Sequence, residues 1–296
     1  MCSYTTTKSY DFKGHLNTMH EIDVDLTCDK CDSPCNNDIG IKIGGQALSN
    51  LEYSDDIVLM EKSPLKLQRF IDIFEKISKE IGLELNISKT KCMKISKMDT
   101  KPLVIRIGQK TAEEVSSFTY LGFEITCDGK DEKAVKARIA LGWAAVNKKF
   151  DLLKSNVLSM MNKVNIVETY IYPVVRYGLE VVALSKSLKS KIDVFQNDVM
   201  RLLTGNNKLD KVRIEKLNEM TNLKNLFEMI KSDKESLFYK TKISVKGVSK
   251  LCLEGLVEGK RSRGRPKRRW TDDLKEWSSS NNIQEAFIKI KAKLEK

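Results

Sequence analysis

Two adjacent carboxylates interrupt an apolar run and limit how this part of the chain can fold. Asp55 and Asp56 lie inside residues 51–60, directly before the apolar residues 57–60. A core strand cannot hold them, because burying an unpaired carboxylate is costly. One flat strand cannot expose both, because successive side chains point to opposite faces. We therefore expect the pair at the tip of a hairpin, where carboxylate oxygens can hold a hard cation such as Mg²⁺.

The charge of the chain is large and unevenly placed. The 296 residues carry a net charge of +12, yet residues 1–60 contain four Lys or Arg and ten Asp or Glu. The chain after residue 60 is therefore strongly basic. Such a body favours a polyanionic partner, with nucleic acid first and an anionic membrane second. The alternative is a solvated Lys-rich surface.

Cysteine usage and hydropathy indicate the compartment. The chain has seven cysteines, an odd number, and no apolar leader is visible in its first twenty residues. No stretch approaches the roughly eighteen consecutive apolar residues of a membrane span. We expect a reduced, intracellular protein of the nucleus or the cytoplasm, with the nucleus favoured, and no membrane partner.

Three of the cysteines form a C-x2-C-x3-C cluster near the N-terminus. Cys28, Cys31 and Cys35 follow His15 and His20. Thiolate and imidazole ligands can hold zinc tetrahedrally, but a structural zinc site usually has two regular ligand pairs. One pair here is irregular. We therefore favour the alternative, in which residues 1–38 are an acidic, poorly ordered leader that contains thiols and no zinc.

The chain after the acidic pair predicts a mixture of helix and strand. Ser63-Pro64 is a typical helix start, and Gly82 is a typical helix end. Residues 83–87 alternate like a half-buried strand, and residues 92–95, 104–107 and 118–125 predict further strands. The apolar positions at helical spacing between Ser63 and Gly82 are Leu67, Phe70, Ile71, Phe74, Ile77 and Ile81.

Beyond residue 130 the periodicity becomes helical. We expect helices over about 131–150, 157–172, 188–202 and 223–238. The second should stop at Pro173, because proline breaks the helical hydrogen-bond ladder. Tyr177-Gly178 predicts a break, and Gly205 predicts the end of the third helix.

The order of these pieces resembles the reverse transcriptases of non-LTR retrotransposons, from about residue 39 to about residue 277. The pieces are a Y-x-D-D hairpin, an amphipathic helix, a G-L-x-x-N-x-x-K-T-K segment, an F-x-Y-L-G segment and a basic helical region. Each is short, and their common order and spacing make the resemblance specific. The residues that carry it are Tyr53, Asp55, Asp56, Gly82, Leu83, Asn86, Lys89, Thr90, Lys91, Phe118, Tyr120, Leu121, Gly122, Arg138, Ile139, Tyr172, Pro173, Tyr177, Gly178, Leu179 and Glu180.

The resemblance implies an α+β fold. It consists of a partial reverse-transcriptase palm, with antiparallel strands and a helix, followed by an all-α thumb-like bundle. The expected domains are the leader (1–38), the partial palm with its primer grip (39–130), the thumb-like helical domain (131–206) and a helical, basic C-terminal region (207–296).

The resemblance also implies roles for individual side chains. Asp55 would hold Mg²⁺ or Mn²⁺ ions that activate a primer hydroxyl, with Asp56 as a supporting ligand. Tyr53 would pack under the primer end or the incoming nucleotide. Lys89 would lie near the triphosphate as a point charge or a proton donor, although alone it looks like an ordinary turn lysine. The primer-grip residues that would hold the primer strand are Phe118, Tyr120, Leu121 and Gly122.

One part of the family pattern is missing. Two-metal nucleotidyl transfer needs a third carboxylate, which the family supplies from an earlier F-x-D-x-x-x-A-F-D motif. Only 52 residues precede Tyr53, and none of them fits that motif. Asp25 is the nearest candidate, but its spacing and neighbours disagree. We therefore expect a C-terminal half that is inactive alone, because the fingers and the upstream catalytic Asp are absent, unless another chain supplies them.

The basic tail has two functional interpretations, besides the alternative of a solvated loop. It resembles the end of many such open reading frames, where it would touch the phosphates of RNA or DNA. Arg263-Gly264-Arg265-Pro266 is also the core of an AT-hook, which reads A·T pairs in the minor groove. We favour the first reading and expect a helix to start at Trp270. The tail residues expected to bind nucleic acid are Arg261, Arg263, Arg265, Lys267, Arg268 and Arg269.

Two functions stay open at this point. In the first, the chain derives from an RNA-directed DNA polymerase that binds template and primer. In the second, it is a non-catalytic nucleic-acid-binding protein that uses the thumb-like helices and the tail.

Overall fold

The computed structural model describes residues 40–80, 82–95, 101–244, 247–254 and 268–295. They form two compact units. The first unit contains the described residues of 1–94, 98–115 and 244–263, and the second contains those of 95–97, 116–243 and 264–296. Short strands and one long helix dominate the first unit, and helices dominate the second, which confirms the α+β class. The four predicted domain ranges stay predictions.

The first unit begins with two hairpins. Strand β1 (Ile41–Ile43) pairs with β2 (Gln46–Leu48), and β3 (Asn50–Tyr53) pairs with β4 (Asp56–Leu59). Both pairs are antiparallel and two-stranded. The hairpin predicted for the acidic pair is therefore confirmed.

Helix α1 (Pro64–Glu80) follows, and both predicted ends are correct. At its C-terminus the amide of Gly82 donates to the Lys79 carbonyl at 3.1 Å, and the amide of Leu83 donates to the Ser78 carbonyl at 2.8 Å. This is a Schellman motif, which needs the left-handed conformation that Gly82 adopts at φ 79°. Glycine reaches that conformation without strain, which is why the sequence signal was reliable.

Four very short strands pack beside α1. Strand β5 (Lys91–Cys92) runs parallel to β8 (Glu113–Glu114), and β6 (Arg106–Ile107) is antiparallel to β7 (Lys110–Thr111). The side-chain amide of Gln68 on α1 acts like a strand edge, because it donates to the Arg106 carbonyl and accepts from the Arg106 amide, each at 2.7 Å. The small core between them consists of Ile71, Cys92, Leu103, Ile105, Ile107 and Ala112.

The strands predicted in this region were partly wrong. Residues 83–86 pair with no strand among the described residues, and a turn follows them at 87–89. Leu83 is mostly exposed, while Leu85 and Ile87 pack on the small core, so the alternating pattern reflects one-sided burial without strand pairing. The strands predicted at 92–95 and 104–107 shrink to β5 and β6.

The second unit begins with the hairpin of β9 (Ser117–Tyr120) and β10 (Phe123–Thr126). The prediction of one continuous strand over 118–125 was wrong. Leu121 and Gly122 have φ values of 47° and 74°, so the chain reverses in a two-residue turn of type I′. A leucine in a left-handed conformation is unusual, which explains why the pattern did not reveal the turn.

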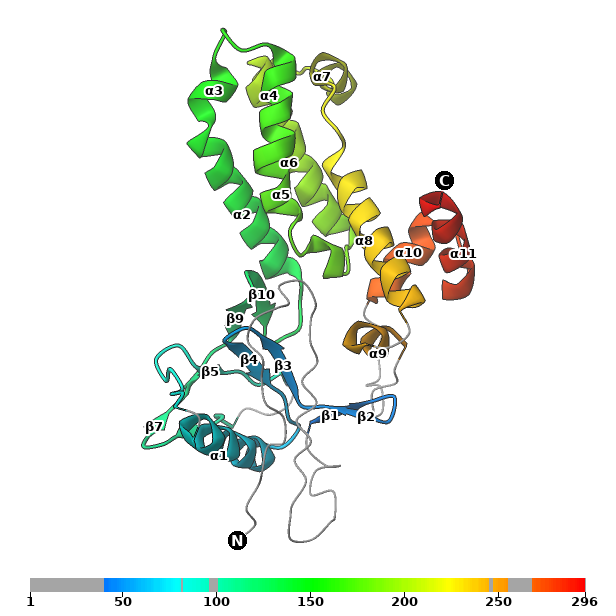
Figure 1. Ribbon diagram of the computed structural model, residues 1–296. Coiled ribbons are helices and arrows are strands. Elements are labelled where there is room, and N and C mark those ends of the chain that lie inside the picture. The colour runs from blue at the N-terminus through cyan, green and yellow to red at the C-terminus, as the bar shows by residue number, and fades with distance from the viewer. Residues whose placement is uncertain (1–39, 81, 96–100, 245–246, 255–267, 296) are drawn as a thin grey trace. The chain divides into compact units, whose positions relative to one another are not determined.

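The helices of the second unit follow the predicted periodicity, and Figure 1 shows α2, α5 and α6 side by side. The predicted helices at 131–150, 188–202 and 223–238 are confirmed as α2, α6 and α8, and the break at Tyr177-Gly178 is confirmed as well. The helices up to residue 243 are α2 (Glu132–Lys148), α3 (Phe150–Lys154), α4 (Met160–Ile166), α5 (Tyr172–Arg176), α6 (Lys186–Thr204), α7 (Ile214–Thr221) and α8 (Leu226–Ile243).

Pro173 does not stop the helix in which it lies. A π-helical turn (Val167–Ile171) precedes it, and the Tyr172 amide donates to the Val167 carbonyl, one residue further back than in an α-helix. This wider turn makes room for the proline ring, which would otherwise collide with the carbonyl four residues earlier. The chain therefore continues helically through α5 to Arg176.

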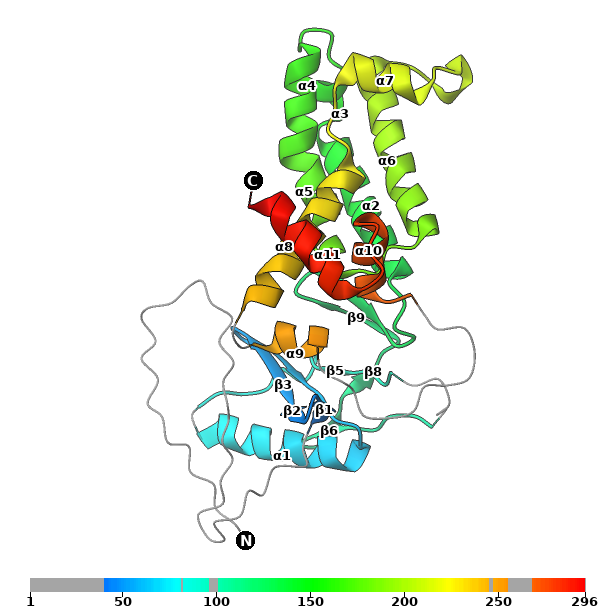
Figure 2. The ribbon, with the colours of Figure 1, turned by 90° about the vertical axis from the view of Figure 1, so that its right-hand side faces the viewer.

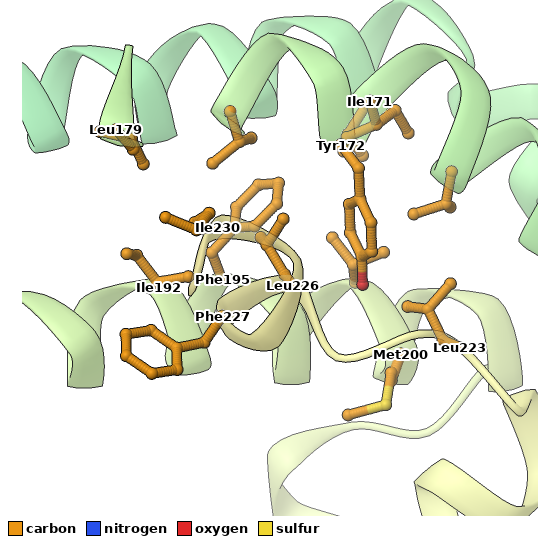
Figure 3. Close-up of a cluster of buried hydrophobic side chains, with 14 of the residues drawn as sticks. Ile171, Tyr172, Leu179, Ile192, Phe195, Met200, Leu223, Leu226, Phe227 and Ile230 are labelled. Carbon is orange, nitrogen blue, oxygen red and sulfur yellow. The ribbon is translucent and has the colours of Figure 1, made fainter. Parts of the chain in front are cut away.

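The main core joins these helices. Figure 3 shows Phe195 and Ile192 of α6 facing Ile230 and Leu226 of α8, with Tyr172 beside them. All of them are almost fully buried. This cluster makes the helical part of the second unit a single packed body.

The chain ends in two further helices, α10 (Trp270–Trp277) and α11 (Ile283–Leu294), which lie beside α8 (Figure 2). The helix predicted to start at Trp270 is confirmed. Helix α9 (Val248–Glu254) belongs to the first unit. Among the described residues, no helix is both long and apolar enough to span a membrane.

Candidate nucleic-acid interface

The acidic pair lies at the tip of the β3–β4 hairpin. Ser54 and Asp55 form the turn, and Asp56 begins β4 opposite Tyr53. All four side chains are exposed, and Tyr53 keeps 56% of its surface accessible. Ser54 has a left-handed φ of 55°, which the tight reversal requires. Neither carboxylate forms an ion pair with any residue that the structure describes.

The donors at this tip match a hard divalent cation only in part. Mg²⁺ is usually bound through one or two carboxylates together with water and substrate phosphates, and Asp55 and Asp56 supply two carboxylates. Within the described ranges, no group of three or more His, Cys, Asp or Glu residues could hold a metal ion. The pair therefore suits an ion that is completed by water and by the phosphates of a ligand.

Lys89 lies in the first unit, in the turn that follows Asn86. Its amide donates to the Asn86 carbonyl at 3.1 Å and to the Asn86 side-chain oxygen at 3.2 Å. Asn86 thus holds the turn through its side chain, as in an Asx turn. The Lys89 side chain is exposed, so its ammonium group is available to an anion.

The predicted primer-grip residues form one end of the second unit. Phe118 pairs across the β9–β10 hairpin with Ile125, and Tyr120 pairs with Phe123. Residues two apart on a strand share a face, so these four side chains form one apolar face. Phe118 and Ile125 are 37% and 36% exposed, whereas Phe123 packs against the main core. The face is therefore anchored at the turn and open at the strand ends.

Two helical side chains hold the turn of this hairpin. The Tyr177 hydroxyl donates to the Leu121 carbonyl at 2.7 Å. Arg138 of α2 donates from Nη2 to the Gly122 carbonyl, and its guanidinium stacks on the Tyr177 ring at 4.4 Å from the centroid. Leucine at a left-handed φ costs about 1–2 kcal/mol, so these contacts offset strain in the turn.

The surroundings of Arg138 are tight and mostly dry. The side chain is buried, and burial lowers the pKa of its guanidinium, while Tyr177 and Glu180 act in the opposite direction. A β-carbon on Gly122 would stand 3.3 Å from Arg138. A β-carbon on Gly178 would stand 2.7 Å from the Phe123 ring. Glycine at both positions thus permits the close packing of the hairpin on the helices.

The other face of the hairpin is charged. Glu124 forms an ion pair with Lys133 of α2 at 2.7 Å and accepts a hydrogen bond from Thr119 at 2.8 Å. Lys133, Thr119 and Ser117 together lower the pKa of the Glu124 carboxyl to about 2. This contact fixes the second face of the hairpin to the start of α2.

Only the end of the basic tail is described. Arg261, Arg263, Arg265 and Lys267 lie outside the described residues, as do Asp25 and the Cys28, Cys31 and Cys35 cluster. Arg268 is held by Asp273 and Glu276, each at 2.6 Å. Arg269 precedes α10, its amide donates to Asp272 at 2.8 Å, and its side chain is exposed.

Behind Arg268 lies a buried ion pair that the sequence did not reveal. Lys234 of α8 and Asp273 of α10 are both fully buried, with Nζ and Oδ2 2.5 Å apart. Asp273 also accepts from the Leu184 amide at 2.8 Å, and Lys234 donates to the Val182 carbonyl at 2.7 Å. Burial lowers the pKa of Lys234, and Asp273 opposes this shift. Lys234 and Asp273 lie 39 residues apart on two different helices, and no local sequence pattern predicts a contact between them.

Comparison with known proteins identifies a distant relative of this chain. No family model matches the chain. The chain is similar to a putative uncharacterized transposon-derived protein of Caenorhabditis elegans, with 25% identity over 167 residues. These residues are 56% of this chain and 60% of that protein, so the similarity spans about three fifths of the relative's length.

Proposed function

We propose that this chain is the nucleic-acid-binding C-terminal half of a reverse transcriptase from a non-LTR retroelement. One observation carries the proposal. Phe118–Gly122, Arg138 and Tyr177-Gly178 were separate motifs in the sequence, and they meet around a single turn. The resemblance assigned these motifs to one type of protein, and their contacts at one turn are what a shared site requires. The similarity to a transposon-derived protein supports the same origin.

The ligand that suits this site is a primer paired with a template. The exposed ends of the hairpin face, Phe118 and Ile125, offer apolar contact to sugars or bases. Tyr177 and Arg138 occupy the carbonyls of Leu121 and Gly122, so the turn presents its amides, which are common donors to phosphate. The strongly basic chain adds a long-range attraction to RNA and DNA.

For the acidic pair we propose binding of Mg²⁺ or Mn²⁺ through Asp55, with Asp56 in support. When bound, such an ion would supply charge neutralisation and activation of a hydroxyl nucleophile. Asp55→Asn should weaken Mn²⁺ binding at least about tenfold, since it removes one of two charged donors. Electron paramagnetic resonance of free Mn²⁺ measures this directly. Glu84→Gln, which neutralises another exposed carboxylate of the same unit, is the matched control, and equal affinities of both variants would remove Asp55 as a ligand.

We further propose that residues 1–296 do not extend a primer alone. An oligo(dT)–poly(rA) substrate with Mg²⁺ and dTTP tests this, with a complete reverse transcriptase as the positive control. Robust extension by the isolated chain would overturn the proposal. Extension that appears only after addition of a second chain with the fingers and the opposing carboxylate would support a split enzyme.

A non-catalytic nucleic-acid-binding protein is the second candidate, favoured by the partial ligand set at Asp55 and Asp56. In that case Asp55→Asn leaves nucleic-acid binding unchanged, and there is no extension activity for it to abolish. In a split enzyme the same variant binds template–primer normally but abolishes extension by the reconstituted pair. Gel shifts with A·T-rich and G·C-rich duplexes at equal salt test the tail separately, because equal affinities exclude an AT-hook.

A further inference from the structure

We infer that Arg138 and Tyr177 are positioning residues, which hold the Leu121-Gly122 turn in the shape that binds a nucleic-acid strand. This inference rests on the proposed function and extends it to two helical residues that would not touch the ligand themselves. It concerns the second unit alone, in which α2, α5 and the β9–β10 hairpin all lie.

The first step is that, among the described residues, the carbonyls of the turn are hydrogen-bonded to side chains and its amides are not. The turn has two carbonyls between its strands, and each has its own donor, Tyr177 for Leu121 and Arg138 for Gly122. Within the described part of the chain, no residue accepts from the amides of Leu121 and Gly122. The two donors therefore fix which side of the turn faces the helices, and the amide side is left for a ligand.

The second step is the coupling of the two donors. The Arg138 guanidinium lies over the Tyr177 ring at 4.4 Å, so each side chain stabilises the position of the other. Arg138 is buried on α2, and Tyr177 ends the helical stretch of α5. The turn is thereby tied to two helices of the main core. Because the core is close-packed, the hairpin moves together with these helices.

The third step is the close contact beneath the turn. Phe123 approaches Gly178 so closely that a side chain there would collide with its ring. Gly178 has a φ of 75°, a left-handed conformation that glycine adopts without strain directly after Tyr177. Phe123, the first residue of β10, is therefore held by its contact with Gly178, while the turn before it is held by Tyr177 and Arg138.

A direct ligand contact and a positioning role differ in their salt dependence. Removing a side chain that binds a phosphate lowers the slope of log affinity against log salt by about one. Removing a positioning residue weakens binding but leaves the number of phosphate contacts unchanged. Arg138→Met carries this test, because only a cationic side chain contributes to the slope. Tyr177→Phe complements it, because it deletes only the hydroxyl and keeps the ring beneath Arg138.

The experiment measures binding of a fluorescent oligo(dT)–poly(rA) duplex by anisotropy at several salt concentrations. We expect Tyr177→Phe to bind about threefold to tenfold more weakly, as for the loss of one structural hydrogen bond. Arg138→Met should bind more weakly still, with an unchanged salt slope, and a slope lowered by about one would make Arg138 a direct phosphate contact and overturn its positioning role. Hydrogen exchange of the amides in residues 117–126 should accelerate in both variants.

Glu168→Ala is the matched control. Glu168 accepts from the Lys224 amide at 3.0 Å, pairs with the Lys224 ammonium at 2.8 Å and, like Tyr177, links segments 56 residues apart, but it does not contact the hairpin. Because alanine removes both contacts, an effect through lost stability would also weaken binding by this variant, whereas positioning predicts full affinity for it. If the wild-type chain binds the duplex and Tyr177→Phe binds it with the same affinity, this inference is overturned and the proposed function stays intact. A wild-type chain that does not bind the duplex overturns both.

Discussion

Breaking the buried pair of Lys234 and Asp273 should strongly destabilise the second unit. Asp273 accepts three hydrogen bonds, from Lys234 at 2.5 Å, Arg268 at 2.6 Å and the Leu184 amide at 2.8 Å. Asp273→Ala removes all three and leaves the buried Lys234 ammonium with the Val182 carbonyl as its one hydrogen-bond acceptor in the described part of the chain. Breaking a buried pair in this way costs about 3–5 kcal/mol. That is a large part of the 5–15 kcal/mol of a typical domain, so the variant should be close to unfolding.

Replacing both partners should cost much less. In Lys234→Met with Asp273→Leu no charge remains buried without a partner, and the two side chains keep an apolar volume. The double variant should therefore be more stable than Asp273→Leu alone, and a mutant cycle that also includes Lys234→Met alone should give a coupling free energy of about 3 kcal/mol. Glu228→Gln is the control on the same helix, because Glu228 is 59% exposed and its ion pair with Lys231 should contribute less than about 1 kcal/mol.

Urea unfolding followed by tryptophan fluorescence is the appropriate assay. The chain has three tryptophans, and all of them, Trp143, Trp270 and Trp277, belong to the second unit. Two of their rings lie 5.0 and 5.4 Å from the Lys234 ammonium. The signal therefore reports on the unit that contains the pair. A free energy of unfolding for Asp273→Ala within about 1 kcal/mol of the wild-type value would refute the reasoning. A coupling free energy near zero would refute it as well.

Three further predictions concern the same unit. Tyr172→Phe should raise the free energy of unfolding by about 1 kcal/mol, because the buried hydroxyl has no hydrogen-bond partner among the described residues (Figure 3), and a loss of stability would reveal one. Glu124 has a pKa of about 2 when folded and an ordinary value of 4.5, so its stabilisation is present above pH 4.5 and lost as the pH falls through 2. Because its partner Lys133 is 57% exposed, we expect only about 1 kcal/mol, and Glu124→Gln should flatten the decline of the urea midpoint between pH 5 and pH 2. Gly142→Ala should destabilise by about 1–3 kcal/mol, since its methyl group would overlap Val175, and a neutral result would mean that α2 can shift.

The sequence predicted the helices well because their signals are local. Ser63-Pro64 and Gly82 bracket α1, and Gly205 ends α6 in the left-handed conformation that glycine allows. Each signal depends on one residue and its immediate neighbours. Pro173 misled for the same reason, because the π-helical turn that accommodates it depends on packing against other helices.

The strands were harder because pairing is not local. Residues 83–87 alternate as a strand should, yet no partner is within reach in the described chain, and a one-sided contact with the small core produces the same pattern. The turn at Leu121-Gly122 was missed because leucine rarely supports a left-handed φ without outside help. That help comes from Tyr177, 56 residues away. The candidate site residues therefore stay a prediction, and the geometry that brings Tyr177 to this turn was not visible in the sequence.

The basic tail shows how a count of charges overstates a binding site. Arg268 looked like one more cation for a phosphate, but its guanidinium already binds Asp273 and Glu276, which follow five and eight residues later. The acids of α10 were visible in the sequence, and helical spacing would have brought them near the end of the tail. Asp273 and Glu276 take Nε and Nη2 of the guanidinium, so a phosphate would share Arg268 with two carboxylates. Arg268 therefore stabilises the start of α10 through these two carboxylates. The exposed Arg269 is the better candidate of the two for binding a phosphate.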